Sequence, residues 1–256
     1  MILNISKILF MLLMTARIFG LFLSVPVLSD RSIPQMIKLV LALWIGLLLG
    51  MATPMPSDIP QIPLVFVIAL VNELFVGFLT GFICRIIFVG IEMAGAMMDM
   101  QMGLSVAATF DPANGGQVTI MERIMFTLAT FLVLATNTHH LFLVSIYESF
   151  KVIPVAHFVE YQGILQQLGS LASKLFMTAL DLSIPLLIII FLLDFSLGLL
   201  ARLAPQVNVF FLGFQIKPML GLWIFVFIIP VLANDISNIF NETMVEIYKF
   251  FSNVKV

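Results

Sequence analysis

The sequence predicts an all-α integral membrane protein of kinked helices and helical hairpins around a central non-helical segment. Three observations support this prediction. Of the 256 residues, 61% are hydrophobic and only 10% are charged, whereas a soluble domain carries about 25% charged residues. Long apolar runs alternate with short stretches rich in proline, glycine and polar residues. The apolar runs also have uneven lengths, whereas a simple membrane span needs about 20 residues.

Six apolar regions are expected to be helical, namely residues 8–28, 36–53, 64–91, 124–143, 176–201 and 219–233. The third is long for a single straight span, and the sixth is short and contains Pro230. The fourth is uniformly apolar only up to Ala135, before a polar run that includes His139 and His140. Hairpins and kinked helices packed on protein explain these lengths better than six simple spans.

Two further segments have amphipathic patterns. Residues 157–175 place apolar side chains at helical spacing, with Glu160, Gln166 and Lys174 on the other face. The tail from 236 to 251 repeats this pattern. We expect both segments to lie at an interface or against a partner.

Several functional classes are disfavoured by composition. The net charge is −2 without a basic tail, so nucleic acid is not an expected partner. The single cysteine, Cys84, cannot form an internal disulfide, and no spacing typical of a metal site is present. No glycine-rich phosphate loop occurs, and Ser105 lacks a nucleophile-elbow pattern. We therefore expect neither an enzyme nor a bound cofactor.

Seven ionisable residues lie in or beside apolar runs: Arg17, Lys38, Glu73, Arg85, Asp99, Asp181 and Asp194. A charge in lipid costs about 2.5–3.5 kcal/mol on insertion scales. These side chains should therefore face protein or water, or pair with opposite charges, including charges on neighbouring chains. The alternative is a proton-coupled secondary transporter that uses Glu73, Asp181 and Asp194. Such transporters commonly contain internal repeats, and the two halves of this chain show no convincing one.

The stretch from 92 to 116, EMAGAMMDMQMGLSVAATFDPANGG, is the most irregular part of the chain. Its methionines adapt to irregular apolar surfaces, whereas its Asp-Pro and Gly-Gly pairs break regular structure. One interpretation is a water-exposed connecting loop. The other is a non-helical segment at membrane depth, which requires burial by protein or a position lining a cavity.

A second irregular stretch, ARLAPQVNVFFLGFQIK, spans residues 201–217. Pro205 is expected to end the preceding helix, and Gln206 and Asn208 need hydrogen-bond partners if they are buried. Arg202 either pairs with Asp194 or reaches another chain. The high apolar content suggests that something covers this stretch. Elsewhere, Gly46-x-x-x-Gly50 and Gly77-x-x-x-Gly81 would allow close helix packing.

The stretches at 201–217 and 101–116 resemble signatures of the FliR family of the flagellar type III protein export gate, which is related to the injectisome SctT export-apparatus proteins. Three further stretches support the resemblance: ARIFGLFLSVPVLSDRSIP at 16–34, NELFVGFLTG at 72–81 and EMAGAMMDMQ at 92–101. The likeness covers nearly the whole chain.

The resemblance implies a single-copy subunit of a hetero-oligomeric gate with FliP and FliQ, in the bacterial inner membrane at the flagellar basal body. FlhB and FlhA associate with such gates, and unfolded flagellar subunits pass through the lumen. The loop matching 101–116 would plug that lumen. The candidate plug and gate residues are Met98, Met100, Met102, Phe110, Asp111, Pro112, Gly115 and Gly116.

The candidate assembly residues are Arg17, Glu73, Arg85, Glu92, Asp194, Arg202, Pro205, Gln206, Asn208 and Lys217. Residues 1–256 are expected to form one export-gate domain. It would comprise N-terminal helices over 1–92, the methionine-rich segment and plug loop over 93–123, and C-terminal helices over 124–256.

Overall fold

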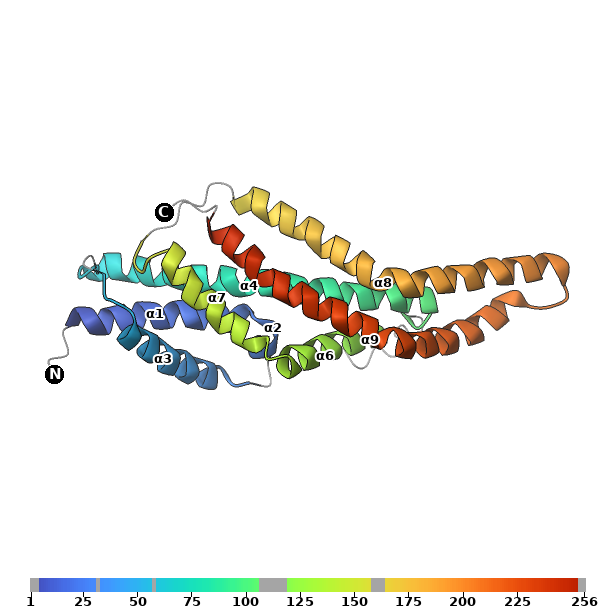
Figure 1. Ribbon diagram of the computed structural model, residues 1–256, viewed down its shortest axis with the longest axis horizontal. Helices are drawn as coiled ribbons and strands as arrows, with labels where there is room; N and C mark the ends of the chain where they lie inside the picture. The colour runs from blue at the N-terminus through green and yellow to red at the C-terminus, as the bar shows by residue number, and fades with distance from the viewer. Residues whose placement is uncertain (1–4, 31–32, 57–58, 106–118, 158–163, 253–256) are drawn as a thin grey trace. The chain divides into compact units, whose positions relative to one another are not determined.

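The computed structural model describes the chain except residues 1–4, 31–32, 57–58, 106–118, 158–163 and 253–256, and all regular structure in the described residues is helical (Figure 1). In chain order the helices are α1 Ile5–Ser24, α2 Pro26–Ser29, α3 Gln35–Ala52, α4 Pro63–Met102, α6 Ile120–Ala135, α7 His139–Val152, α8 Ile164–Leu203 and α9 Val209–Ser252. The all-α prediction is confirmed for this part of the chain.

Five of these helices contain stretches long and apolar enough to cross a membrane: Ile5–Ser24, Gln35–Ala52, Pro63–Met102, Gly169–Leu203 and Val209–Glu242. The apolar region 124–143 is not among them. A turn divides it between α6 and α7, and Asn137 in that turn has a positive φ of 56°. Asparagine tolerates this left-handed conformation better than most residues. This region is therefore two shorter helices, and the first of them ends at Ala135, where the uniformly apolar sequence also ends.

The two segments predicted to be amphipathic helices are parts of longer helices. From Ile164 the first continues without a break through the next apolar region, so that α8 has 40 residues. The tail likewise continues α9, which has 44 residues. Prolines lie inside both helices, at Pro185 in α8 and at Pro218 and Pro230 in α9. Proline is tolerated in membrane helices where neighbouring groups satisfy the freed backbone.

The chain forms two compact units. Unit 1 contains Met1–Ile86, Asn137–Leu171 and Phe240–Val256, and unit 2 contains Ile87–Thr136 and Ala172–Ile239. Helices α4, α8 and α9 each contribute residues to both units.

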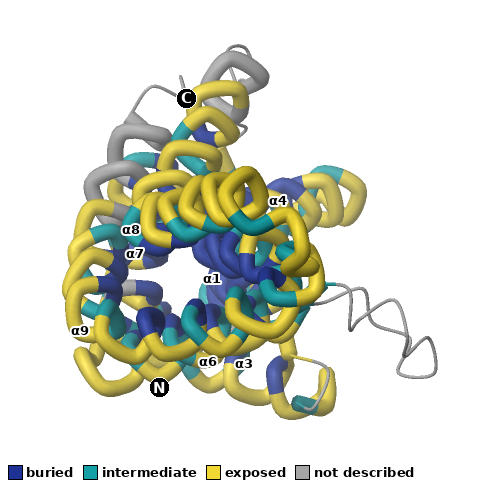
Figure 2. Tube along the Cα trace, turned by 90° about the vertical axis from the view of Figure 1, so that its right-hand side faces the viewer, coloured by how far each residue is buried: buried dark blue, intermediate teal, exposed yellow. Residues whose placement is uncertain are grey.

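Unit 1 is organised around α1, most of which is buried (Figure 2). The glycines of both predicted spacings face α1. A Cβ at Gly46 or Gly50 would collide with Thr15 or Met11, and a Cβ at Gly77 would overlap the backbone oxygen of Arg17. Small residues let helix backbones approach closely in membranes. The close packing predicted from the two glycine spacings is confirmed.

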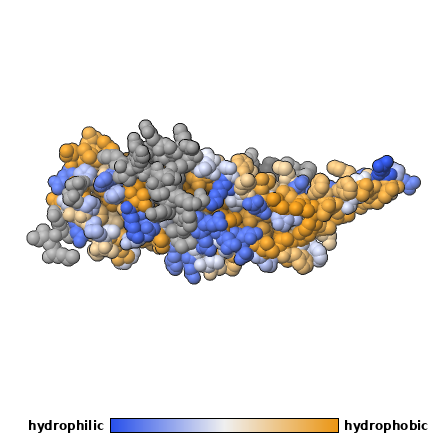
Figure 3. Space-filling model, turned by 45° about the horizontal axis from the view of Figure 1, so that its top comes forward, coloured by the Kyte–Doolittle hydropathy of each residue, from blue (hydrophilic) through white to orange (hydrophobic). Residues whose placement is uncertain are grey.

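Unit 2 contains the end of α4, α6 and the larger parts of α8 and α9. Its core includes buried Met98, Met102, Met121 and Met125. A Cβ at Gly95 would lie 2.7 Å from the Cα atom of Glu122, so the glycine allows α6 to approach α4. By contrast, the most apolar windows of α8 and α9 are only 17% and 22% buried. Their outer surface is largely apolar up to the turn that joins them (Figure 3).

Candidate functional site

The first cluster of predicted residues is a buried ion pair in unit 1. Arg17 of α1 donates from Nε to Oε2 of Glu73 of α4 at 2.6 Å, and both side chains are 0% exposed. Gly20 and Gly77 allow this geometry because they bring the two helix backbones into contact. The requirement that these charges pair is therefore met within the chain.

The same ion pair holds the backbone that follows α7. Arg17 Nη1 donates to the Ser149 hydroxyl at 3.3 Å and to the Ile153 carbonyl oxygen at 2.9 Å. Glu73 Oε1 accepts from the Ala156 backbone N–H at 2.9 Å. Ala156 has a φ of 69°, a conformation that non-glycine residues rarely adopt.

Two further contacts complete this arrangement. Asn72 Nδ2 donates to the His157 carbonyl oxygen at 2.9 Å. The Arg17 guanidinium carbon lies 4.4 Å from the centroid of the Phe150 ring, a cation–π contact. Among the described residues, Arg17 Nη2 has no hydrogen-bond partner. We call Arg17, Asn72 and Glu73 the α1–α4 clamp, because together they bind the backbone of residues 153–157.

The second cluster lies in unit 2, at the end of α4 and the beginning of α6, which enclose the segment proposed from the sequence as the plug. Met98, Asp99 and Met102 are 0% exposed in the last turns of α4, whereas Met100 is 73% exposed. Asp99 Oδ1 accepts from the Met121 backbone N–H at 3.2 Å, near the start of α6. Anionic groups are favoured at helix N-termini. Asp99 thus connects the end of α4 to the beginning of α6.

The flanking helix ends have sequence-encoded boundaries. Gly103, with φ 77°, follows the last residue of α4. A capping box begins α6, in which Thr119 accepts from the Glu122 backbone and Glu122 accepts from the Thr119 backbone. The other plug candidates, Phe110, Asp111, Pro112, Gly115 and Gly116, lie outside the described residues.

The third cluster is the α8–α9 turn, also in unit 2. Asp194 accepts from Lys217 at 2.6 Å, with the side chains 39% and 27% exposed respectively. The proposed pairing of Asp194 with Arg202 is therefore replaced by pairing across the helical hairpin. Sequence proximity favoured Arg202, but the antiparallel path of α9 brings Lys217 beside Asp194 (Figure 1).

The signature residues themselves are exposed within this chain. Helix α8 ends at Leu203, just before Pro205, as predicted. Asn208 Oδ1 accepts from the Phe211 backbone N–H at 3.2 Å and so caps α9. Gln206 and Arg202 are exposed, and Phe210 is 85% exposed. The expectation that something covers this stretch is therefore not met by the described residues of this chain.

The remaining candidates are dispersed. Arg85 is exposed, and Glu92 is half-buried in α4. Lys38 is buried and donates from Nζ to the Asp30 carbonyl oxygen at 3.0 Å. Asp181 is exposed on α8. Across the part of the chain that the structure describes, no group of three or more histidine, cysteine or acidic side chains could hold a metal ion.

The fold and these clusters define a helical membrane protein with several candidate spans. Residues 8–243 match the sequence family described as bacterial export proteins, family 1. The chain therefore belongs to this family. The resemblance to FliR noted from the sequence is confirmed.

Curated relatives extend this result over most of the chain. The flagellar biosynthetic protein FliR of Escherichia coli (strain K12) is 30% identical over 226 residues, which cover 88% of this chain and 86% of that protein. FliR of Bacillus subtilis (strain 168) is 28% identical over 236 residues, with 91% of each chain covered. FliR of Aquifex aeolicus (strain VF5) is 24% identical over 242 residues, covering 94% of this chain and 93% of that protein.

Proposed function

We propose that this chain is a non-enzymatic subunit of the flagellar type III protein export gate in the bacterial inner membrane. The observation that carries the proposal is the similarity to flagellar biosynthetic proteins over nearly the whole chain. Its partners would be FliP and FliQ within the gate, FlhB and FlhA beside it, and unfolded flagellar proteins in transit.

The exposed apolar surface of unit 2 supports a role in a larger assembly. Exposed apolar patches of this kind mark lipid-facing or protein-binding surfaces. The α8–α9 turn exposes both apolar side chains, including Leu203 and Phe210, and the signature residues Arg202, Pro205 and Gln206. We assign this turn to contacts with the partner subunits.

The proposed gating mechanism concerns the segment between α4 and α6. Apolar side chains can close a pore by excluding water, and Phe110 with the nearby methionines would form this seal. Gly115 and Gly116 would let the segment change its backbone conformation, because glycine tolerates shapes that other residues avoid. The Asp99 contact with α6 and the Thr119–Glu122 capping box support this role, since both define the ends of the segment.

The first test is the composition of the native complex. The protein, tagged at chromosomal expression level, is extracted in mild detergent, and the mass and subunit content of its complex are measured. We expect one copy of this chain with several copies of two other small membrane proteins. A monomer or homo-oligomer in good yield would contradict the proposal and favour the proton-coupled transporter, although Glu73 is already paired with Arg17.

A further inference from the structure

Helix α8 exposes one acidic side chain within an apolar surface of unit 2. Asp181 lies inside the candidate span Gly169–Leu203 and is exposed. Its exposed neighbours on the helix are Met177, Leu180 and Ile184, all of them apolar. These side chains share one face with Asp181, because helix positions three and four apart are neighbours. An apolar surface of this kind is typically covered by lipid or by another protein.

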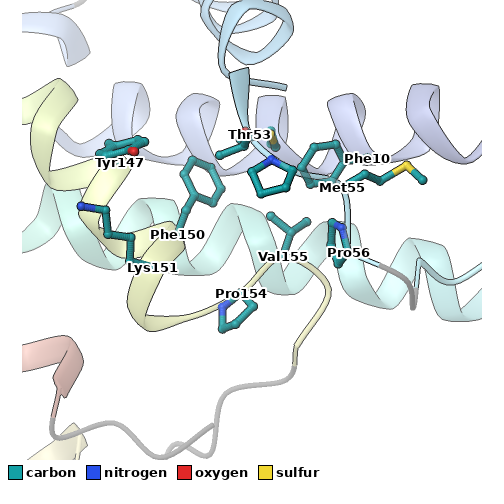
Figure 4. A pocket seen from close by; sticks show the side chains of 11 residues that line it. Phe10, Thr53, Met55, Pro56, Tyr147, Phe150, Lys151, Pro154 and Val155 are labelled. Carbon is teal, nitrogen blue, oxygen red and sulfur yellow. Dashed lines mark hydrogen bonds between the residues drawn. The ribbon is translucent and has the colours of Figure 1, made fainter. Parts of the chain in front are cut away.

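Two other charges at apolar surfaces have partners within the chain. On the same helix, Asp194 accepts from Lys217 at 2.6 Å. In unit 1, Lys151 lies in the wall of a mainly apolar cavity (Figure 4) and donates to Glu148 at 2.7 Å. The side chain of Asp181, by contrast, has no hydrogen bond or ion pair with any residue that the structure describes. The chain therefore leaves this carboxylate without a counter-charge of its own.

Pro185 places a second acceptor in need of a donor at the same residue. Proline has no backbone N–H, so it cannot donate the usual helical hydrogen bond to the carbonyl oxygen four residues earlier, which belongs to Asp181. The nearby Ser183 hydroxyl donates to the Leu180 carbonyl oxygen instead. Once this surface is covered, both the carboxylate and the backbone oxygen of Asp181 need hydrogen-bond donors.

The materials that could cover this face differ in what they supply. Lipid acyl chains suit the apolar side chains, but they offer no donor, and an unpaired charge in lipid is costly. Water satisfies the acceptors, but it leaves the apolar side chains exposed. A helix of another protein chain meets both needs if it is apolar and carries one basic side chain. Arginine suits this position best, because its guanidinium group presents five N–H donors in a fixed fork.

We propose that the Asp181 face of α8, formed by Met177, Leu180, Asp181 and Ile184, binds an apolar helix of another protein chain through an arginine side chain. The arginine pairs with the Asp181 carboxylate and donates to the Asp181 carbonyl oxygen. This contact is separate from the α8–α9 turn, because Asp181 lies roughly 30 Å along the helix from that turn. The inference rests on the proposed assembly, since it requires a neighbouring chain.

The first test measures how much native complex is recovered in mild detergent from cells that express the variants Asp181→Leu and Asp181→Asn at chromosomal level. We expect Asp181→Leu to lower the yield at least about fivefold, because the arginine would be buried without its counter-charge. Asp181→Asn should have a smaller effect, since its amide oxygen still accepts a hydrogen bond. Asp235→Leu is the matched control, because Asp235 is exposed on α9 beside exposed Asn234 and Asn238.

The direction of the change in Asp181→Leu separates the three coverings. A face covered by lipid predicts an equal or higher yield, because a costly charge is removed, and a face in water predicts no change. Either result, with a normal wild-type complex, would overturn this inference and leave the proposed function intact. A monomeric wild-type chain would contradict both. Thermal unfolding of each isolated full-length variant in detergent should show no loss of stability, because Asp181 has no partner among the described residues.

The second test identifies the arginine. A photoreactive phenylalanine analogue replaces Leu180 in the full-length chain, and the cross-linked peptide from the native complex is identified by mass spectrometry. We expect a peptide of a different chain that contains an arginine. Asp181→Arg should then abolish assembly, and exchange of the partner's arginine for aspartate should restore it. A cross-link to a second copy of this chain, a peptide without arginine, or no restoration by the exchange would overturn the proposal.

Discussion

Arg17 illustrates how a single buried charge can organise its surroundings. Its guanidinium group contacts one side chain on α4, one on α7, the backbone after α7 and an aromatic ring. Removing one partner from a buried ion pair is costly because it leaves an uncompensated charge. The pair also gives Ala156 a hydrogen-bond partner for its backbone N–H. Arg17 and Glu73 therefore determine the path of the chain after α7.

Glu73→Gln should lower the stability of unit 1 substantially, by about 3–5 kcal/mol, since Arg17 remains buried without its counter-charge. Thermal unfolding of the full-length protein in detergent measures the effect. The double variant Arg17→Met/Glu73→Leu should be more stable than Glu73→Gln alone, because it removes both charges. Asp235→Asn on the exposed face of α9 is the control. A double variant no more stable than the single one would contradict this account of the clamp.

At the scale of the elements, glycine positions determine which helices approach one another. Gly20 of α1 and Gly77 of α4 lie at the crossing of these helices, and Gly46 and Gly50 serve the same purpose on α3. Not every glycine has such a role. Apart from the neighbouring residues and backbone of its own helix, Gly198 of α8, for example, has no heavy atom within 4 Å of the position that a Cβ would occupy.

This difference gives a matched pair of substitutions. Gly77→Ala should destabilise the protein, because the new methyl group would overlap the Arg17 backbone. We expect a loss of about 1–3 kcal/mol or more, since overpacking usually costs about that much. Gly198→Ala should be neutral or stabilising by up to about 1 kcal/mol, since alanine favours helices more than glycine does. Thermal unfolding in the same detergent compares the two variants. Equal losses of stability would show that the α1–α4 crossing is less close than described.

On the scale of the whole molecule, the candidate membrane spans differ in how much of their apolar surface the chain buries. The α1 window of unit 1 is 56% buried within the chain, whereas the α8 and α9 windows are 17% and 22% buried. Apolar helix surface of this extent requires lipid or other protein chains around it. The window of α3, also in unit 1, is only 22% buried. Helix α1 therefore lies in a core within the chain, whereas α3, α8 and α9 depend more on their surroundings.

The proposed plug leads to a prediction for the assembled gate. Deleting residues 106–115 should make cells leak small ions when the complete gate is expressed, because the seal would be absent. Ion permeability is measured with a membrane-potential dye. Replacing the same residues by an equally long Gly-Ser segment should also cause leakage, because flexible polar residues do not exclude water. Unchanged permeability in both variants, with a normal yield of the complex, would contradict the plug role.

Much of the fold could be predicted from local patterns. Apolar runs identified the membrane helices, Pro205 marked the end of α8, and the two four-residue glycine spacings identified helix contacts. Local patterns gave the wrong helix boundaries where an amphipathic segment is followed directly by an apolar one. The amphipathic segment before 176 and the apolar segment after it were read as separate elements, but α8 continues through both. A change in the polarity of the surroundings does not require a break in the helical backbone.

The sequence by itself determined the helical class, the membrane character and the family, because composition, periodicity and extended similarity are properties of the chain in order. Only the tertiary structure decided which charges meet. Arg17 pairs with Glu73, and Asp194 pairs with Lys217 rather than Arg202. Each pair joins residues that are distant in sequence. Their distance depends on how separate helices pack against one another, and a pattern read along one helix does not contain that information.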